Sequence, residues 1–226
     1  MHVADFSIGM LGANGIVGGG FGIATGAALA IKYQARPEVA ICFFGDGAAN
    51  KGTFHEALNF AGLHQLPVVF VCENNRYAQF TSAARTTAVT DISVRAASYG
   101  IVGESIDGND LLAVIDSAGR AIERARTGGG ATLVNMATYR HSGHYVGDAE
   151  QYRAREEVDA SRQFGDPITR FVQTIVDGGL LTQVDVDAVT AGVEAQIDTA
   201  QAFASAAPYP DAAEALRDVF TVGGQQ

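Results

Sequence analysis

Two short, uninterrupted apolar runs constrain the fold of this chain more than any other sequence feature. They span Val39–Phe44 and Val68–Cys72, and each has the length of one strand and is too short for a typical helix. A run without polar alternation is typical of a strand in a parallel sheet that helices cover on both faces. A helical pattern occupies residues 50–63 between the two runs, so the segment predicts a right-handed βαβ unit.

The alternation of strand and helix patterns extends to residue 137. A helix rich in Gly and Ala is expected at residues 17–31, buried at or near a subunit contact, where small residues such as Gly18, Gly22 and Gly26 would allow close approach. The other expected elements are a short helix at 91–99, a strand at 101–106, a helix from Asn109 or Asp110 to Arg126, and a strand at 131–137. The predicted fold class is therefore α/β, a parallel sheet with helices on both faces.

The pattern changes after residue 137. Residues 138–150 are polar and contain two histidines, and we expect this segment to be mobile until it binds a ligand. Helical patterns without strands then follow near residues 154–163, 167–177, 184–204 and 211–220. We therefore expect an α/β domain at 1–150 and a helical extension at 151–226 that packs on it.

The composition restricts both partners and location. The 226 residues carry a net charge of −10, which disfavours binding to nucleic acid or to an anionic membrane surface. Residues 1–147 are nearly neutral, so the acidity is concentrated in the helical extension, as expected of a solvated surface. No apolar run is long enough to span a membrane, and no signal peptide is expected. Cys42 and Cys72 lie in the apolar runs and predict buried free thiols in a reducing compartment, the cytoplasm.

Polar residues follow both predicted strands at the edge of the sheet where ligands bind. Asp46 follows the first strand and Asn75 follows the second, and their oxygens are the type of ligand that Mg²⁺ prefers. Gly45 and Gly47 leave room for a phosphate near the backbone at the start of the next helix. The Gly-Asp-Gly sequence is also common in hairpin turns, but a helical pattern, and no antiparallel strand, follows it here.

Five segments of the chain together resemble one enzyme family, the α subunit of the thiamine diphosphate-dependent E1 component of 2-oxo acid dehydrogenases. The family includes pyruvate, branched-chain 2-oxo acid and acetoin dehydrogenases. The Gly-Asp-Gly and Asn-Asn sequences are similar to the thiamine diphosphate motif. The resembling segments are Gly12–Gly18, Phe44–Asn50, Phe54–Asn59, Cys72–Ala78, and Tyr139–His144 with Tyr152-Arg153.

The resemblance implies a role for each matching residue around the metal and the diphosphate. Asp46 and Asn75 would bind Mg²⁺ through their side chains, and Tyr77 through its backbone carbonyl. Gly47 and Ala48 would lie along the diphosphate.

The resemblance also implies roles around the organic part of the cofactor. Gly15 would offer its carbonyl to the aminopyrimidine, and Val17 would hold the cofactor bent. His144 would be the catalytic histidine on a loop over the diphosphate and the substrate, and Arg140 would help to order that loop and to bind the cofactor. His55 and His64 are expected to be packing or surface residues.

The reaction that the resemblance implies is decarboxylation of a 2-oxo acid or cleavage of acetoin, with transfer of the acyl group to a lipoyl group of the E2 acyltransferase. The cofactor acts as the electron sink. The glutamate that activates the cofactor comes from the β subunit in this family, so we expect an α₂β₂ assembly and an inert isolated chain. Tyr145 follows His144 where the mammalian pyruvate enzyme has a phosphorylated serine, so control by phosphorylation is not expected there.

Family members carry a further segment before the Met1-His2 pair, so we expect a truncated chain, a misplaced start or a separate first polypeptide. Three alternatives to an active E1 α subunit are therefore weighed. Such a chain could be a non-catalytic remnant that keeps only the fold. It could also be the N-terminal half of a split transketolase. A nicotinamide-binding domain is disfavoured, because no strand is followed by the expected G-x-G-x-x-G turn.

Overall fold

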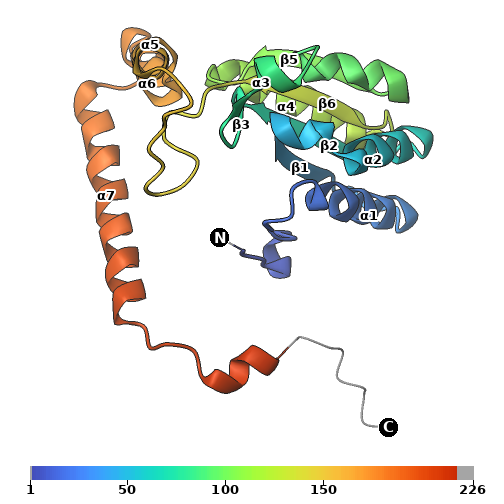
Figure 1. Ribbon diagram of the computed structural model, residues 1–226, viewed down its shortest axis with the longest axis horizontal. Coiled ribbons are helices and arrows are strands. Elements are labelled where there is room, and N and C mark those ends of the chain that lie inside the picture. The colour runs from blue at the N-terminus through green and yellow to red at the C-terminus, as the bar shows by residue number, and fades with distance from the viewer. Residues whose placement is uncertain (1, 218–226) are drawn as a thin grey trace. The chain divides into compact units, whose positions relative to one another are not determined.

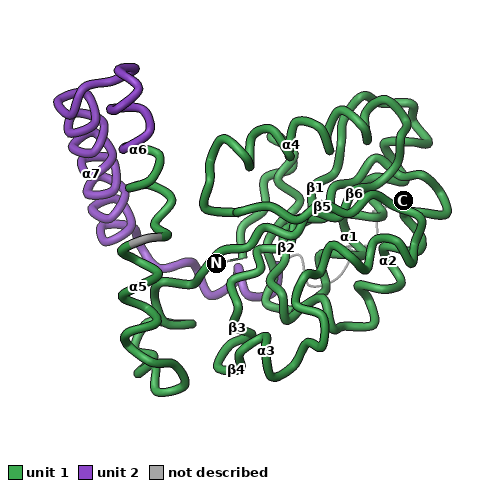
Figure 2. Tube along the Cα trace, turned by 90° about the horizontal axis from the view of Figure 1, so that it is seen from above, with its two compact units in different colours: residues 1–171 green, residues 172–226 purple. Residues whose placement is uncertain are grey.

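A computed structural model describes residues 2–217, except for the side chain of Phe164 (Figure 1). The chain forms two compact units, Met1–Phe171 and Val172–Gln226, which are coloured separately in Figure 2. The first unit contains the sheet and every residue of the candidate site. The division into domains at residue 150 stays a prediction.

The first unit is built on a four-stranded parallel sheet. Its strands are β1 (Ala40–Gly45), β2 (Val68–Asn74), β5 (Val102–Asp107) and β6 (Thr132–Ala137), in the order β1-β2-β6-β5. All three pairings are parallel, so the carboxyl ends of the strands lie at one edge. Helices cover both faces, and the predicted α/β class is confirmed.

One face of the sheet is covered by α1 (Gly19–Tyr33), α2 (Gly52–Leu63) and the 3₁₀ helix Ile92–Tyr99, and this face holds the main core. Aromatic rings fill it. The rings of Phe21 and Phe44 meet edge to face with their centroids 4.8 Å apart.

Helix α4 (Leu111–Arg126) lies on the opposite face from α1 and α2 (Figure 2). It begins where the sequence predicts, because the Asp110 carboxylate accepts hydrogen bonds from the backbone N–H groups of Leu112 and Ala113. It contacts β2, β5 and β6, and its buried Ala121 belongs to a second, smaller core cluster.

The prediction that helices cover both faces of strand β1 was wrong. We expected it to be covered on both faces, as β2 is, but Ile41 is 43% exposed and Phe43 is 65% exposed. The physical reason is its place at the edge of the sheet, beyond the strands that α4 contacts. Within the described residues, an apolar strand face is therefore open.

Helix α1 packs within this chain through Phe21, Ala24 and Ala28. Close approach at the glycine-rich start of the helix is confirmed at Gly18, where a Cβ atom would lie 2.7 Å from the Oγ1 atom of Thr53. A Cβ atom placed at Gly22 or Gly26 would meet no described atom within 4 Å, so within this chain these positions are not close contacts. Their proposed contact with another subunit stays a prediction.

A small hairpin that the sequence analysis missed follows β2. It consists of β3 (Tyr77–Ala78) and β4 (Thr81–Ser82), and a single helical turn, α3 (Ala83–Thr86), comes after it. Two-residue strands have no periodicity to detect. The predicted helix near 91–99 exists as a 3₁₀ helix, and part of the one predicted near 211–220 does as well. The segment Phe6–Ile8 is a 3₁₀ helix that was not predicted.

The helices predicted after residue 150 are present. They are α5 (Arg155–Gly165), α6 (Pro167–Asp177), α7 (Gln183–Ala206) and the 3₁₀ helix Ala212–Leu216. Residues 218–220 of the last predicted helix lie outside the described residues. None of the helices in residues 2–217 combines the length and the apolar character that crossing a bilayer would require.

Candidate functional site

Asp46 follows β1 at the carboxyl edge of the sheet and opens the 3₁₀ helix Asp46–Asn50. Its side chain is only 3% exposed, and its Oδ1 atom has no hydrogen-bond partner among the described residues. Burial raises the pKa of this carboxyl group, although backbone N–H groups and the charge of Arg140 act in the opposite direction. A buried carboxylate oxygen without a partner is costly, and a cation would compensate it.

Asn75 and Tyr77 lie beside Asp46 because of the parallel register, in which Gly45 pairs with Glu73. The Oδ1 atom of Asn75 accepts a hydrogen bond from the backbone N–H of Tyr77 at 3.2 Å, which forms a tight turn. The ring of Tyr77 is buried, and its hydroxyl donates to the Glu157 carboxylate at 3.0 Å. Burial and this bond raise the pKa of Tyr77 to about 12.

The first asparagine of the Asn-Asn pair has a different role. The Nδ2 atom of Asn74 donates to the carbonyl of Thr90 and to the Oδ1 atom of Asn135, both at 3.0 Å. Asn135 in turn donates to Ser105 at 2.9 Å, so the network crosses from β2 through β6 to β5. Asn74 therefore stabilises the carboxyl edge of the sheet, and the half-buried Asn75 remains as the candidate ligand beside Asp46.

Position 47 requires a glycine because the start of the 3₁₀ helix Asp46–Asn50, which we call the Asp46 turn, packs closely on the β3–β4 hairpin. A Cβ atom at Gly47 would lie 2.6 Å from the Cβ atom of Ala78, which is next to Tyr77. The hairpin therefore packs closely on the turn that carries Asp46, Gly47 and Ala48.

The two glycines that flank Asp46 provide a matched pair of substitutions. We expect Gly47→Ala to reduce the free energy of unfolding by about 1–3 kcal/mol, because the added methyl group overpacks the contact with Ala78. Gly45 has φ −81° and an added Cβ there meets nothing within 4 Å. Gly45→Ala should therefore be neutral or stabilising, by up to about 1 kcal/mol. Urea unfolding of both variants checks this, and equal stabilities would contradict the packing.

The segment 138–150, which we call the histidine loop, brings Arg140 next to the hairpin. The Nη2 atom of Arg140 donates to the carbonyl of Gln79 at 2.6 Å and to the hydroxyl of Tyr152 at 2.8 Å. Its Nη1 atom lies 3.4 Å from the carbonyl of Tyr77 and 3.5 Å from the Nδ1 atom of His144. Arg140 thus lies between the predicted metal ligand and the predicted catalytic histidine.

His144 is exposed at the tip of the histidine loop. Its backbone N–H donates to the Asp148 carboxylate at 2.8 Å, and its ring lies edge to face with Phe80 at a centroid distance of 6.3 Å. The ring is therefore free to approach a ligand. His55 and His64 pack against Tyr99 and Phe60, as expected of packing residues.

Two residues of the predicted site line one cavity beside α1 and β1. They are Val17, which is exposed, and Ala48, and the volume of the cavity is about 1000 Å³. Gly15 does not line this cavity, and a Cβ atom at Gly15 would lie 3.2 Å from the Nε2 atom of His2. The structure therefore brings Val17 and the Asp46 turn to one cavity, while the roles assigned to Gly15 and Val17 stay predictions.

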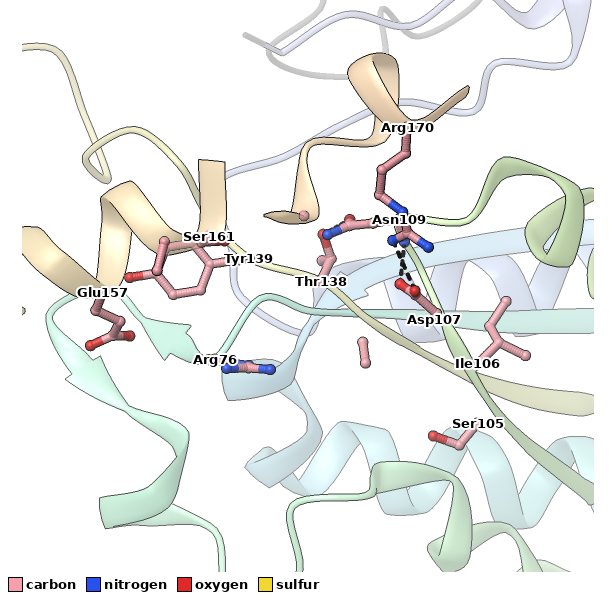
Figure 3. Close-up of a pocket in the computed structure, with 13 residues that line it drawn as sticks. Arg76, Ser105, Ile106, Asp107, Asn109, Thr138, Tyr139, Glu157, Ser161 and Arg170 are labelled. Carbon is pink, nitrogen blue, oxygen red and sulfur yellow. Dashed lines mark hydrogen bonds and ion pairs between the residues drawn. The ribbon is translucent and has the colours of Figure 1, made fainter. Parts of the chain in front are cut away.

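A second pocket, of about 740 Å³, lies at the carboxyl ends of β5 and β6 (Figure 3). None of the predicted site residues lines it, although Arg76 lies between Asn75 and Tyr77 in the sequence and Tyr139 precedes Arg140. An ion pair of 2.9 Å between Arg170 and Asp107 crosses one side of the pocket. The Asp107 carboxylate in this pocket is therefore paired, unlike the carboxylate of Asp46.

The residues around Asp46 fit a magnesium diphosphate better than a metal held by protein alone. In residues 2–217 no group of three His, Cys, Asp or Glu side chains could hold a metal ion. The predicted set is instead one carboxylate, one amide oxygen and one carbonyl, and Mg²⁺ commonly completes such a set with phosphate oxygens and water. The buried, unpaired Oδ1 atom of Asp46 is the observation that supports this fit.

The sequence analysis missed the residues that hold the histidine loop in place. The Asp148 carboxylate accepts hydrogen bonds from the backbone of His144 and Glu150 and from the hydroxyl of Tyr152. The side chain of Arg153, at the base of the loop, is buried. The Tyr152-Arg153 pair was visible only as part of the family resemblance, since nothing in the sequence indicates that this arginine is buried.

Comparisons with known proteins agree with this geometry. The model of the family described as "Dehydrogenase E1 component" matches residues 1–213. The α subunit of acetoin:2,6-dichlorophenolindophenol oxidoreductase is 45% identical over 223 residues in Bacillus subtilis and 46% identical over 220 residues in Cupriavidus necator. The pyruvate dehydrogenase E1 component subunit alpha of Rhizobium meliloti is 38% identical over 219 residues.

The alignments cover 97% of this chain in each of the three cases. The chain spans 66% of the length of the two acetoin relatives and 63% of the length of the Rhizobium protein. It therefore covers slightly less than two thirds of each relative. The transketolase and nicotinamide-binding alternatives are not supported. The family match and the identities show that the chain belongs to the dehydrogenase E1 component family, among its α subunits.

Proposed function

We propose that this chain is the α subunit of a thiamine diphosphate- and Mg²⁺-dependent E1 enzyme. The observation that carries the proposal is the buried Asp46 carboxylate, whose unpaired Oδ1 atom lies at the carboxyl edge of the sheet. Asn75 and the carbonyl of Tyr77 belong to the turn after β2, which lies beside the end of β1. The family membership supports this assignment.

In the proposed site each residue has a distinct task. Asp46, Asn75 and the carbonyl of Tyr77 hold the cation, and Gly47 and Ala48 allow the diphosphate to approach the backbone. When bound, thiamine diphosphate supplies the electron sink for cleavage of a carbon–carbon bond. Arg140 contributes positive charge beside the diphosphate, and His144 is free to contact the substrate or its lipoyl acceptor.

Acetoin is the substrate that we propose first, with pyruvate and branched-chain 2-oxo acids as rivals. The relatives named for acetoin share 45% and 46% of aligned residues with this chain, against 38% for a relative named for pyruvate dehydrogenase. The reaction would be that of an oxidoreductase acting on an oxo group, with the lipoyl disulfide of an E2 acyltransferase as acceptor. We expect it to take place in the cytoplasm.

A β subunit is the proposed partner, in an α₂β₂ assembly. The chain offers no glutamate that matches the cofactor-activating one, so the active site would be completed by the partner. The exposed apolar side chains Ile41 and Phe43 and the cavity beside β1 are consistent with further protein covering this edge.

Gly22 provides a test of assembly. In the isolated chain Gly22→Leu meets open space, so we expect its melting temperature to change by no more than a neutral surface substitution would. If α1 lies at a subunit contact, the same variant should overpack it, at a cost of about 1–3 kcal/mol. Sedimentation of the co-expressed α and β chains would detect the weaker assembly. Unchanged assembly would mean that this helix face is not at the contact.

Turnover by the co-expressed pair tests the function. The chain and a β subunit from the same genome should together release product from acetoin, and neither chain alone should do so. Pyruvate and branched-chain 2-oxo acids serve as competing substrates in the same assay. A correctly assembled pair that acts on none of them would indicate a non-catalytic remnant.

A further inference from the structure

The pocket at the carboxyl ends of β5 and β6 has no part in the proposed function (Figure 3). Its volume of about 740 Å³ lies within the range of small-molecule sites, and ligands of α/β proteins commonly bind at this edge of the sheet. Its lining comes from the turn after β2, from β5 and β6, and from α5 and α6. We call it the Arg76 pocket.

Four charged residues line the Arg76 pocket, and two of them are paired with each other. The Asp107 carboxylate accepts a hydrogen bond from the backbone N–H of Asn109 at 2.9 Å and forms an ion pair with Arg170, also at 2.9 Å. This pair crosses one side of the pocket (Figure 3). The charges that remain for a ligand are therefore those of Arg76 and Glu157.

Arg76 and Glu157 carry opposite charges in the same pocket but do not pair with each other. Within residues 2–217 the guanidinium group of Arg76 has no hydrogen-bond or ion-pair partner. The Glu157 carboxylate accepts the hydroxyl of Tyr77 at 3.0 and 3.1 Å. An ionised carboxylate can accept about four hydrogen bonds, so Glu157 keeps capacity for a further donor. The pocket thus offers one cation and one carboxylate to a ligand.

The backbone of Arg76 also indicates that its side chain has a role outside the turn. Its φ is 72°, a left-handed conformation that glycine and asparagine adopt more easily than arginine does. The carbonyl of Arg76 accepts a hydrogen bond from the backbone N–H of Ala83 at 2.8 Å, and any residue could provide that contact. The turn alone therefore does not explain an arginine here, and strained residues cluster at ligand sites.

Neutral donors and an apolar surface complete the lining. Asn109 is only 9% exposed, and its Oδ1 atom accepts the hydroxyl of Thr138 at 2.6 Å. In the part of the chain that the structure describes, the Nδ2 atom of Asn109 and the hydroxyl of Ser161 have no acceptor. The apolar part of the lining comes from Ile106, Ala137 and Ala160.

We propose that the Arg76 pocket binds a small aliphatic α-amino acid as a zwitterion. The carboxylate of the ligand pairs with Arg76, whose planar guanidinium group suits a two-pronged contact, and Asn109 supplies a further donor. The ammonium group of the ligand pairs with Glu157. A zwitterion fits because the four charges of the lining sum to zero, so a simple anion or cation would leave one of them unpaired. The proposal does not depend on the proposed function.

Saturation-transfer NMR with three related compounds tests the charge requirement on the co-expressed α/β complex. The amino acid 2-aminobutanoate should bind with a dissociation constant on the order of 1 mM. Butanoate lacks the ammonium group and propylamine lacks the carboxylate, so each should bind at least about tenfold more weakly. Butanoate or propylamine that binds as tightly as 2-aminobutanoate would overturn the proposal.

Two substitutions test the location of the site. Arg76→Asn removes the cation but suits the left-handed turn, and Glu157→Gln removes the carboxylate charge. Each should weaken binding of 2-aminobutanoate at least about tenfold. The matched controls are Arg85→Asn and Glu156→Gln, because both residues are exposed and lie outside the pocket lining. Each control should bind within about twofold of the wild-type complex, and equal losses in test and control variants would overturn the proposal.

The same titration with saturating Mg²⁺ and thiamine diphosphate distinguishes this pocket from the proposed cofactor site. Binding of 2-aminobutanoate should persist, because none of the predicted site residues lines the pocket. Complete displacement by the cofactor would place the amino acid at the Asp46 site and overturn the proposal, as would the absence of any binding. Binding that meets these expectations in a complex without turnover supports the pocket, and only the proposed function then fails.

Discussion

Asp46→Asn is expected to stabilise the cofactor-free protein at neutral pH and to abolish metal-dependent binding of thiamine diphosphate. Asparagine has nearly the same shape as aspartate but carries no charge, so it removes the cost of a buried ionised carboxylate. It also removes the only charged ligand of the proposed cation. Loss of one member of a buried charge pair costs about 2–5 kcal/mol, so the affinity should fall by on the order of a hundredfold or more.

The pH dependence of stability follows from the raised pKa of Asp46. A carboxyl group with a raised pKa in the folded state favours folding below its unfolded pKa, about 4, and this contribution is lost as the pH rises through the folded value. The free energies of unfolding of the wild-type protein and of Asp46→Asn should therefore be similar at low pH. They should differ increasingly towards pH 7, where the variant is the more stable protein.

Added cofactor should reverse this order. Magnesium and thiamine diphosphate at about 100 times the dissociation constant would stabilise the wild-type protein by about 2.7 kcal/mol and leave Asp46→Asn unchanged. Thermal unfolding over a pH series, with and without the cofactor, makes both comparisons. A variant that is less stable than wild type without cofactor at pH 7 would show that Asp46 has partners beyond those described.

His144→Ala is expected to have a large effect on turnover and a small one on folding. Loss of a side chain that transfers a proton commonly lowers the rate about 10²- to 10⁴-fold. The His144 ring is exposed and makes only a 3.5 Å contact with Arg140 and a ring contact with Phe80. Its removal should therefore change the free energy of unfolding by no more than about 0.5 kcal/mol.

His64→Ala is the matched control for this prediction. His64 is also exposed and packs on Phe60, with the ring centroids 4.4 Å apart, but it lies far along the chain from the histidine loop. Its substitution should leave kcat unchanged. Steady-state assays of the co-expressed pair compare the two variants, and full activity in His144→Ala would exclude a catalytic role for His144.

Most of the fold could be predicted because its strands and helices have strong local signals. The apolar run of β2 and the Asp110 cap of α4 predict what the structure contains. Coverage of β1 could not be predicted, because an apolar run indicates a strand but not whether the strand is central or at an edge. The β3–β4 hairpin was missed because its two-residue strands are defined by tertiary contacts with the Asp46 turn.

The candidate site could be predicted in part for a similar reason. Parallel topology brings the ends of neighbouring strands together, so Asp46 and Asn75 had to be close once β1 and β2 were identified. The contacts of Arg140 and the burial of Arg153 depend on how the histidine loop folds back on the hairpin. No periodicity or spacing in the sequence encodes that path, so the residues that position the loop appear only in the structure.

Titration calorimetry of thiamine diphosphate into the assembled α/β complex tests the central claim most directly. The account predicts tight binding in the presence of Mg²⁺, binding weakened on the order of a hundredfold or more in EDTA, and no measurable binding to Asp46→Asn under either condition. Equal affinity with Mg²⁺ and with EDTA, or wild-type affinity in Asp46→Asn, would contradict it.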